Sequence, residues 1–118
     1  MYPGIDIIEI QRFADSCRRH PRILERLFSA RELEALKGRN ISSFAVRFAG
    51  KEAVLKALGT GIRGISWHDI EIISSENGEP EVILSEKART IAINRGCTKA
   101  RVSLTHNQTQ AAATAMIF

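Results

Sequence analysis

The sequence predicts an α+β fold in which a small antiparallel sheet packs against helices. Its 118 residues are a typical length for one domain, so we expect residues 1–118 to form a single domain. Turn signals at Asn77-Gly78 and Asn107-Gln108 lie between β-like segments and predict two hairpins. Helical patterns lie before and between these hairpins, an order that favours antiparallel pairing over a parallel sheet.

The N-terminal third is predicted to be a strand followed by helices. β-Branched residues from Gly4 onward predict a short strand, and a helix is expected from Glu9 to Arg19. Ser29 and Glu32, three residues apart, form a capping-box pattern. This pattern predicts that a second helix begins after Ser29, and Gly38 marks its expected end.

The clearest helix is predicted over Ile41–Leu58. Apolar residues recur along one stripe of this segment at helical spacing (Phe44, Phe48, Leu55 and Leu58). Ser42 or Ser43 would cap its start, and Gly59 would cap its end.

Beyond this helix the periodicity changes to two. Alternation over Ile65–Ile73 predicts a strand with both faces partly covered. Turn and cap residues place the remaining elements in chain order: a returning strand with Val82 and Leu84, a helix capped by Ser85 and running to Asn94, and strands at Ala100–Thr105 and Ala111–Phe118.

Composition excludes several classes of protein. With 44% hydrophobic and 25% charged residues, the chain has the composition of an ordinary soluble domain. No apolar run approaches the roughly 20 residues that a membrane-spanning helix needs, and no basic leader precedes an apolar block. Cys17 and Cys97 lack metal-ligand spacing, so we expect a cytoplasmic protein with reduced thiols and no membrane association.

The net charge of +4 is unevenly distributed. Residues 1–63 hold 12 Lys and Arg against 7 Asp and Glu, whereas residues 64–118 hold 5 against 6. This surplus in the first half suggests an acidic partner such as a phosphate, a nucleic acid or an acidic protein. A basic face that serves only solubility explains it equally well.

The candidate chemistry begins with carboxylates. Asp6 lies within an apolar strand, where a buried carboxylate needs a compensating cation or donors. Glu52 and Lys56 share one helix face, and small residues near it, such as Gly50, allow a ligand to approach closely. Two carboxylates without a His or Cys cluster suit a hard ion such as Mg²⁺. A strand-end cap at Asp6 and a surface ion pair between Glu52 and Lys56 are the alternatives.

Three segments together resemble the holo-[acyl-carrier-protein] synthases, the short, stand-alone 4'-phosphopantetheinyl transferases. His106 alone would be an ordinary polar residue at a strand end. The resemblance covers nearly the whole chain in order, and its motifs are specific in combination. They are Gly4-Ile5-Asp6-Ile7, then Arg47-Phe48-Ala49-Gly50-Lys51-Glu52-Ala53 followed by Lys56-Ala57-Leu58-Gly59-Thr60-Gly61, and finally Ser103-Leu104-Thr105-His106.

The resemblance implies an enzyme that moves phosphopantetheine from coenzyme A to a serine of apo acyl carrier protein and releases adenosine 3',5'-bisphosphate. It implies that Asp6 and Glu52 bind the catalytic Mg²⁺, and that Glu52 is the base for the serine hydroxyl, directly or through water. Lys56 would neutralise pyrophosphate charge and protonate the leaving phosphate. The implied contacts to coenzyme A come from Lys56, Gly59, Thr60, Gly61 and His106.

The resemblance also implies partners. Acyl carrier proteins are acidic, and the helix after Asp6 would dock on the carrier through Arg12, with Arg22 and Arg26 nearby. Longer members of the superfamily fuse two such domains around the active site. A short chain is therefore expected to be a homotrimer with its active sites at subunit interfaces. Segment Ala111–Phe118 would face the trimer or pack in the core.

The chain departs from the superfamily's patterns at three places. Ile8 stands where the longer members carry a third acid, as expected of the short type. Gly50 stands where the short enzymes usually have Ala, a change that weakens the helix by up to about 1 kcal/mol and is not expected to alter the chemistry. The start, Met1–Gly4, is shorter than usual, which leaves the extent of the first strand open.

Two other classes of function compete with the transferase. A basic domain that binds nucleic acid would explain the charge, but one Tyr and one Trp provide no RNA-reading aromatic motif. An inactive subunit of a larger synthase would explain the resemblance. Four candidate site residues argue against that second alternative, because each matches its motif (Asp6, Glu52, Lys56 and His106).

Overall fold

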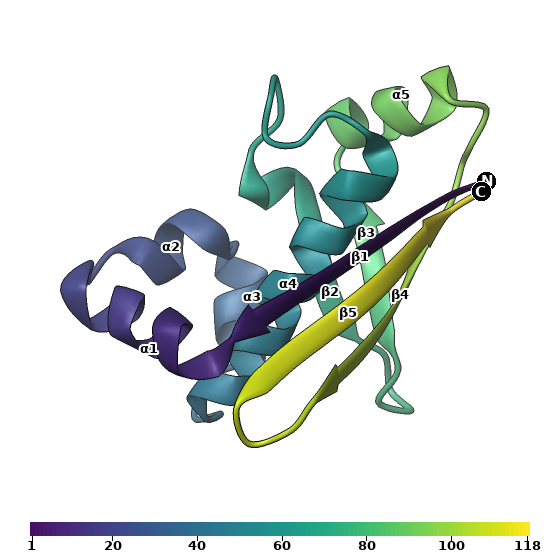
Figure 1. Ribbon diagram of the computed structural model, residues 1–118. Coiled ribbons are helices and arrows are strands. Elements are labelled where there is room, and N and C mark those ends of the chain that lie inside the picture. The colour runs from purple at the N-terminus through teal and green to yellow at the C-terminus, as the bar shows by residue number, and fades with distance from the viewer.

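The computed structural model describes residues 1–118 and has an α+β architecture (Figure 1). Five strands, five α-helices and one short 3₁₀ helix follow one another along the chain. Their bounds are β1 Tyr2–Glu9, α1 Ile10–Arg19, α2 Ile23–Leu27, α3 Ala30–Ala35, α4 Ile41–Leu58, η1 Trp67–Asp69, β2 Ile70–Ser74, β3 Pro80–Leu84, α5 Glu86–Asn94, β4 Ala100–His106 and β5 Gln110–Ile117.

The strands form two antiparallel sheets, as the predicted hairpins require. The larger sheet has the order β1-β5-β4, so the last strand of the chain lies between the other two. Strands β2 and β3 form the smaller sheet, and β3 lies alongside β4. Asp6 faces Ala113 of β5 across the first pairing, and Leu104 faces the same Ala113 across the second.

Helix α4 is the centre of the molecule and contacts both sheets. Figure 1 shows it behind the larger sheet, with α1, α2 and α3 gathered at one end and α5 at the other. One apolar cluster joins its C-terminal half to the sheets and α5, and a second joins its N-terminal half to the first three helices. The helix is buried on more sides than the predicted single stripe, because alanines carry the additional faces (Ala45, Ala49, Ala53 and Ala57).

Gly4 allows β1 to lie directly against α4. A Cβ atom at this position would overlap the carbonyl oxygen of Ala53, so no other residue fits without moving one of the two elements. The contact matters for the site because Ala53 follows Glu52, and Gly4 lies two residues before Asp6 on the same face of the strand. Backbone packing at Gly4 therefore brings the two carboxylates toward each other.

Several boundaries of helices and strands differ from those predicted from the sequence. Asn40, rather than Ser42 or Ser43, caps α4, and its side chain accepts a hydrogen bond from the Ser43 amide. Helix α3 ends at Ala35, before Gly38, which adopts a left-handed conformation in the following turn. The first strand begins at Tyr2, two residues before the predicted Gly4, and runs to Glu9, where the helix was predicted to begin.

The strand predicted over Ile65–Ile73 is shorter than expected. Its first part folds into η1 because Asp69 accepts hydrogen bonds from the Ser66 amide at 2.7 Å and from the Ser85 hydroxyl at 2.7 Å. These bonds tie the turn to the start of α5. The strand itself begins at Ile70.

The space beside Gly50 is filled by neighbouring side chains. A Cβ atom there would lie 2.7 Å from Cδ1 of Ile72 and 2.9 Å from Cδ2 of Leu104. Both atoms are the ends of flexible side chains, which can turn away. Side chains of β2 and β4 therefore fill the space that a methyl group at Gly50 would occupy.

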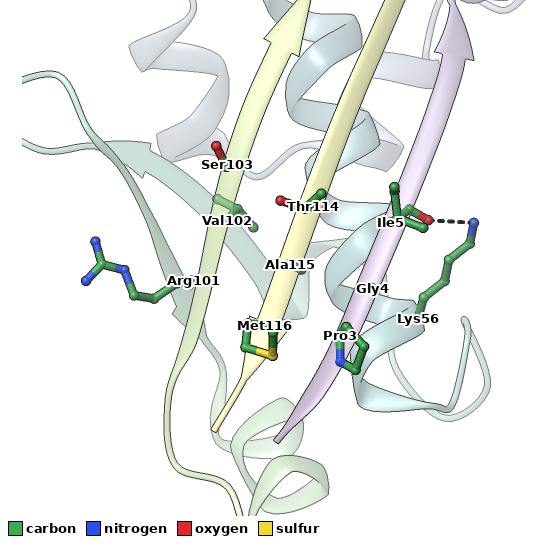
Figure 2. A pocket seen from close by; sticks show the side chains of 10 residues that line it. All are labelled: Pro3, Gly4, Ile5, Lys56, Arg101, Val102, Ser103, Thr114, Ala115 and Met116. Carbon is green, nitrogen blue, oxygen red and sulfur yellow. Dashed lines mark hydrogen bonds between the residues drawn. The ribbon is translucent and has the colours of Figure 1, made fainter.

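The outer face of the larger sheet carries no second layer. Ile5 and Ile7 of β1 are 66% and 60% exposed there. A pocket of about 720 Å³ lies on this face. Figure 2 shows Thr114 and Met116 of β5 among the side chains that line it, with Arg101 of β4 on one side. Alternate residues of β5 point the other way and are buried against α4 (Ala111, Ala113, Ala115 and Ile117). Segment Ala111–Phe118 thus has one core face and one uncovered face.

Candidate active site

Asp6 and Lys56 meet at the edge of β1. The Lys56 ammonium donates to Asp6 Oδ1 at 3.1 Å and to the carbonyl oxygen of Ile5 at 2.9 Å. Figure 2 shows the Lys56 side chain extending from α4 along the edge of β1 to reach that carbonyl. The Lys56 side chain is 55% exposed, so this pair adds little to stability, whereas the Asp6 side chain is only 10% exposed. A ligand can therefore reach the Lys56 ammonium and compete with Asp6 for it.

The second oxygen of Asp6 is unsatisfied. Oδ2 is buried and has no hydrogen-bond partner in the protein. It is the only buried side-chain nitrogen or oxygen atom that lacks one. An unpaired buried carboxylate oxygen is costly and is expected to have a partner such as a cation or an ordered water. Lys56 occupies Oδ1, so the unsatisfied oxygen is an open ligand position.

Glu52 lies near enough to Asp6 for the two charges to interact. Burial raises the pKa of Glu52 above its ordinary value, the negative charge of Asp6 raises it further, and Lys56 partly opposes the rise. Two carboxylates that repel each other, one with a free buried oxygen, form a donor set that suits a hard divalent cation. Asp6 and Glu52 therefore fit Mg²⁺. No group of three or more His, Cys, Asp and Glu side chains gathers anywhere as a ready metal cage.

The segment Gly59–Gly61 follows α4 one turn after Lys56. Gly59 ends the helix in a left-handed conformation, with φ of 79°, as predicted. Arg95 crosses this helix end, donates to the carbonyl oxygen of Ala57 at 3.1 Å and lies over the Tyr2 ring. A Cβ atom on Gly59 would overlap the Arg95 guanidinium, which is the end of a flexible side chain and can shift, so it is the left-handed backbone conformation that favours glycine here. Sequence reasoning missed Arg95, because no local pattern links it to α4.

His106 is not brought to the same place. It pairs with Ala111 of β5, which pairs in turn with Ile8 of β1. Two strand spacings, about 10 Å, therefore separate His106 from β1. It lines a different pocket, of about 460 Å³, together with three arginines (Arg39, Arg47 and Arg101).

This second pocket is strongly basic, and sequence reasoning missed its arginines. Arg47 donates to the Ser74 hydroxyl at 2.7 Å. Burial lowers the pKa of Arg47, and repulsion from Arg39 lowers it further. The surplus of positive charge in residues 1–63 was the available signal, and Arg47 opens the motif that contains Glu52. Glu79 also lines the pocket and lies 3.8 Å from Arg101. Because three arginines face this one carboxylate, the pocket suits an anion such as a phosphate.

The predicted docking residues divide into two groups. Arg12 lines an apolar groove of about 500 Å³ between the end of β1, α1 and α2, whose floor includes Phe13 and Phe48. Phe48 lies one turn before Glu52 on α4, so this groove leads toward the carboxylates. Arg22 and Arg26 do not line it. Arg22 instead lies 3.9 Å from Glu25 on the surface of α2.

Comparison with known proteins identifies the family. The model of the 4'-phosphopantetheinyl transferase superfamily matches residues 2–115. The chain belongs to this superfamily. A holo-[acyl-carrier-protein] synthase of Moorella thermoacetica is 47% identical over 97% of this chain and 91% of its own length. The resemblance noted from the three motifs, and the enzyme class that it implies, a phosphopantetheinyl transferase, are confirmed.

Solved structures of the superfamily have the same fold. The holo-[acyl-carrier-protein] synthase of Helicobacter pylori in complex with coenzyme A has a TM-score of 0.88 at 32% identity, covering 98% of this chain and 99% of its own. That of Bacillus anthracis, described in complex with CoA (3',5'-ADP), has a TM-score of 0.81 at 30% identity, covering 98% and 94%. No helix of the present transferase has the length and apolar character needed to span a bilayer.

Proposed function

We propose that this transferase moves 4'-phosphopantetheine from coenzyme A to a serine hydroxyl of apo acyl carrier protein, with Mg²⁺ bound, and releases adenosine 3',5'-bisphosphate. In this proposal residues 1–118 act as one transferase domain in the cytoplasm, where the two free cysteines, Cys17 and Cys97, stay reduced. The observation that carries the proposal is the pairing of Asp6, whose Oδ2 has no partner, with Glu52, whose pKa is raised.

Each residue of this cluster has a chemical role in the proposal. Asp6 and Glu52 hold the cation, which when bound neutralises charge on the pyrophosphate of coenzyme A. Glu52 accepts the proton of the attacking serine, directly or through a water. Lys56 exchanges its bond to Asp6 for a pyrophosphate oxygen and donates a proton to the leaving phosphate. Gly59, Thr60 and Gly61 bring backbone close to the nucleotide.

The position of His106 supports active sites between subunits. In the proposal His106 contacts the phosphates of coenzyme A, yet within one chain it lies two strands from β1 and lines a separate basic pocket. A neighbouring copy that presents its own basic pocket to Asp6 and Glu52 would complete the site. The uncovered face of β1, β5 and β4, with exposed Ile5 and Ile7, offers a surface for the homotrimer.

The carrier docks beside the carboxylates in this proposal. Arg12 stands at the rim of the apolar groove that ends near Phe48, and it would pair with acidic groups of the carrier while an apolar side chain enters the groove. Arg22 and Arg26 add positive charge on α2 that attracts the carrier before contact. Such charges act mainly on the rate of association.

A mass-shift assay tests the transferase. Incubation of the protein with apo carrier, coenzyme A and Mg²⁺ should add one phosphopantetheine mass to the carrier, and chelation of the metal should abolish the gain. The rate should fall as ionic strength rises, because docking is electrostatic. Light scattering on the active protein should give the mass of three chains. No mass gain on any authentic carrier from the same organism would overturn the proposal.

A further inference from the structure

Two oppositely charged side chains are completely buried beside the candidate active site. Lys51 and Glu32 are both 0% exposed, and the Lys51 ammonium lies 2.5 Å from Glu32 Oε1. The ammonium also lies over the Phe28 ring, 5.1 Å from its centre. No other Lys, Arg, Asp or Glu is buried in this structure.

Two backbone amides hold the Glu32 carboxylate in place. Its Oε1 accepts from the Ser29 amide at 3.0 Å, which closes the capping box of α3. Its Oε2 accepts from the Ile72 amide of β2 at 2.9 Å. With both oxygens occupied by backbone donors, the carboxylate is a fixed anchor for a side chain that arrives from α4.

Lys51 is the residue that α4 presents to this anchor, and Glu52 follows it in the chain. Successive residues of a helix are about 100° apart around its axis, so Lys51 reaches α3 and β2 while Glu52 is presented toward Asp6 of β1. The bond from Lys51 to Glu32 therefore fixes how far α4 is rotated and where it sits along its axis.

Stability alone does not account for this pair. Buried ion pairs are often no more stabilising than apolar side chains of the same shape. Much of the buried surface of α4 consists of small alanine side chains (Ala45, Ala49, Ala53 and Ala57), although Val54, Leu55 and Leu58 are buried as well, and the contact of Ala53 with Gly4 limits how closely β1 approaches. Apolar contacts of this kind are not directional. A buried polar contact, in contrast, is satisfied in a single register.

We propose that Lys51 and Glu32 are positioning residues for the metal site: their buried ion pair sets the rotation of α4 that places Glu52 opposite Asp6. The inference rests on the proposed metal site of Asp6 and Glu52. It concerns residues that touch neither the metal nor the substrates, and it predicts that metal affinity depends on them.

The test is Mn²⁺ binding followed by electron paramagnetic resonance, which needs no carrier and no turnover. The principal variant is the double substitution Glu32→Gln with Lys51→Met, which removes both charges, keeps the side-chain shapes and retains a residue that can close a capping box. Lys51→Arg is the second variant, because it keeps both charges but lengthens the connection between α4 and Glu32. Leu84→Ala, a core substitution in β3, is the control for loss of thermal stability.

We expect the Mn²⁺ dissociation constant to rise about tenfold in the double variant and in Lys51→Arg, a typical effect of residues that orient metal ligands. Leu84→Ala should bind Mn²⁺ like the unaltered protein even where its melting temperature is lowered as much. Unaltered affinity in the folded double variant or in folded Lys51→Arg would overturn the inference while leaving the metal site intact. Failure of the unaltered protein to bind Mn²⁺ would overturn the metal site and the inference with it.

Discussion

Replacement of Glu52 by Gln is expected to lower the transfer rate by about 10²–10⁴-fold, the range typical of a lost general base. The amide keeps the shape of the side chain but can neither accept the serine proton nor neutralise a cation. Asp6→Asn is expected to have a comparable effect, because it removes charge from the one buried side-chain oxygen that lacks a partner. The mass-shift assay under single-turnover conditions measures both.

The same Glu52→Gln variant should be at least as stable as the unaltered protein. Burial and Asp6 raise the pKa of Glu52 in the folded state, so the folded protein binds this proton more tightly than the unfolded chain. That contribution to stability is present at low pH and is lost as pH rises through the raised pKa. In metal-free buffer the melting temperature of the variant should therefore exceed that of the parent increasingly as pH rises toward neutrality. A variant less stable than the parent would contradict the stability prediction, and one that keeps a near-normal rate would remove Glu52 from the proposed role.

Gly4→Ala is expected to damage both stability and activity. The added methyl group would overlap the carbonyl oxygen of Ala53, which is backbone in the middle of α4 and has no rotamer that relieves the clash. Overpacking of this kind typically costs about 1–3 kcal/mol and shifts backbone. The shift separates β1 from α4, so Asp6 moves away from Glu52. Thermal denaturation and transfer rates measured together should both fall.

Gly50→Ala is the matched control, because it also adds one methyl group between α4 and the strands, at a position where β2 and β4 rather than β1 lie against the helix. There the new atom meets only the ends of Ile72 and Leu104. The gain in helix propensity, up to about 1 kcal/mol, offsets the crowding, and the transfer rate should be unchanged. If Gly4→Ala were as well tolerated as this control, close packing of β1 on α4 would not be what positions Asp6.

Short-range sequence patterns were sufficient to predict the elements whose bounds depend on neighbouring residues in the chain. Ser29 and Glu32 form the predicted capping box, the long helix has the predicted bounds at Ile41 and Leu58, and Ser85 caps α5. Fold class followed from the two hairpins and the order of the helices. Prediction failed over Ile65–Asp69 because a side chain sixteen residues away, Ser85, bonds Asp69 and stabilises a turn in an otherwise alternating sequence.

The residues of the candidate site also divide into those that the local sequence predicts and those that only tertiary packing brings together. Asp6, Glu52 and Lys56 were predictable, since a carboxylate in an apolar strand and a charged pair on a small-residue helix are visible in sequence. The Lys51–Glu32 pair was not, because Lys51 read alone is one more charge in a motif and only tertiary packing buries it. The basic pocket at Arg39, Arg47 and Arg101 was missed for the same reason, since β4 and α4 bring its members together from distant parts of the chain.

The place of β5 in the sheet has a consequence for synthesis of the protein. Residues Gln110–Ile117 follow all the other strands in the chain, yet they hold β1 and β4 together, and β1 carries Asp6. A chain that has not yet emerged from the ribosome as far as β5 therefore has its first strand without its hydrogen-bonded neighbour, and the sheet closes only once β5 is available. Truncated chains that end before β5 cannot hold Asp6 against α4. Synthesis of β5 is thus a condition for holding Asp6 of β1 beside Glu52 of α4.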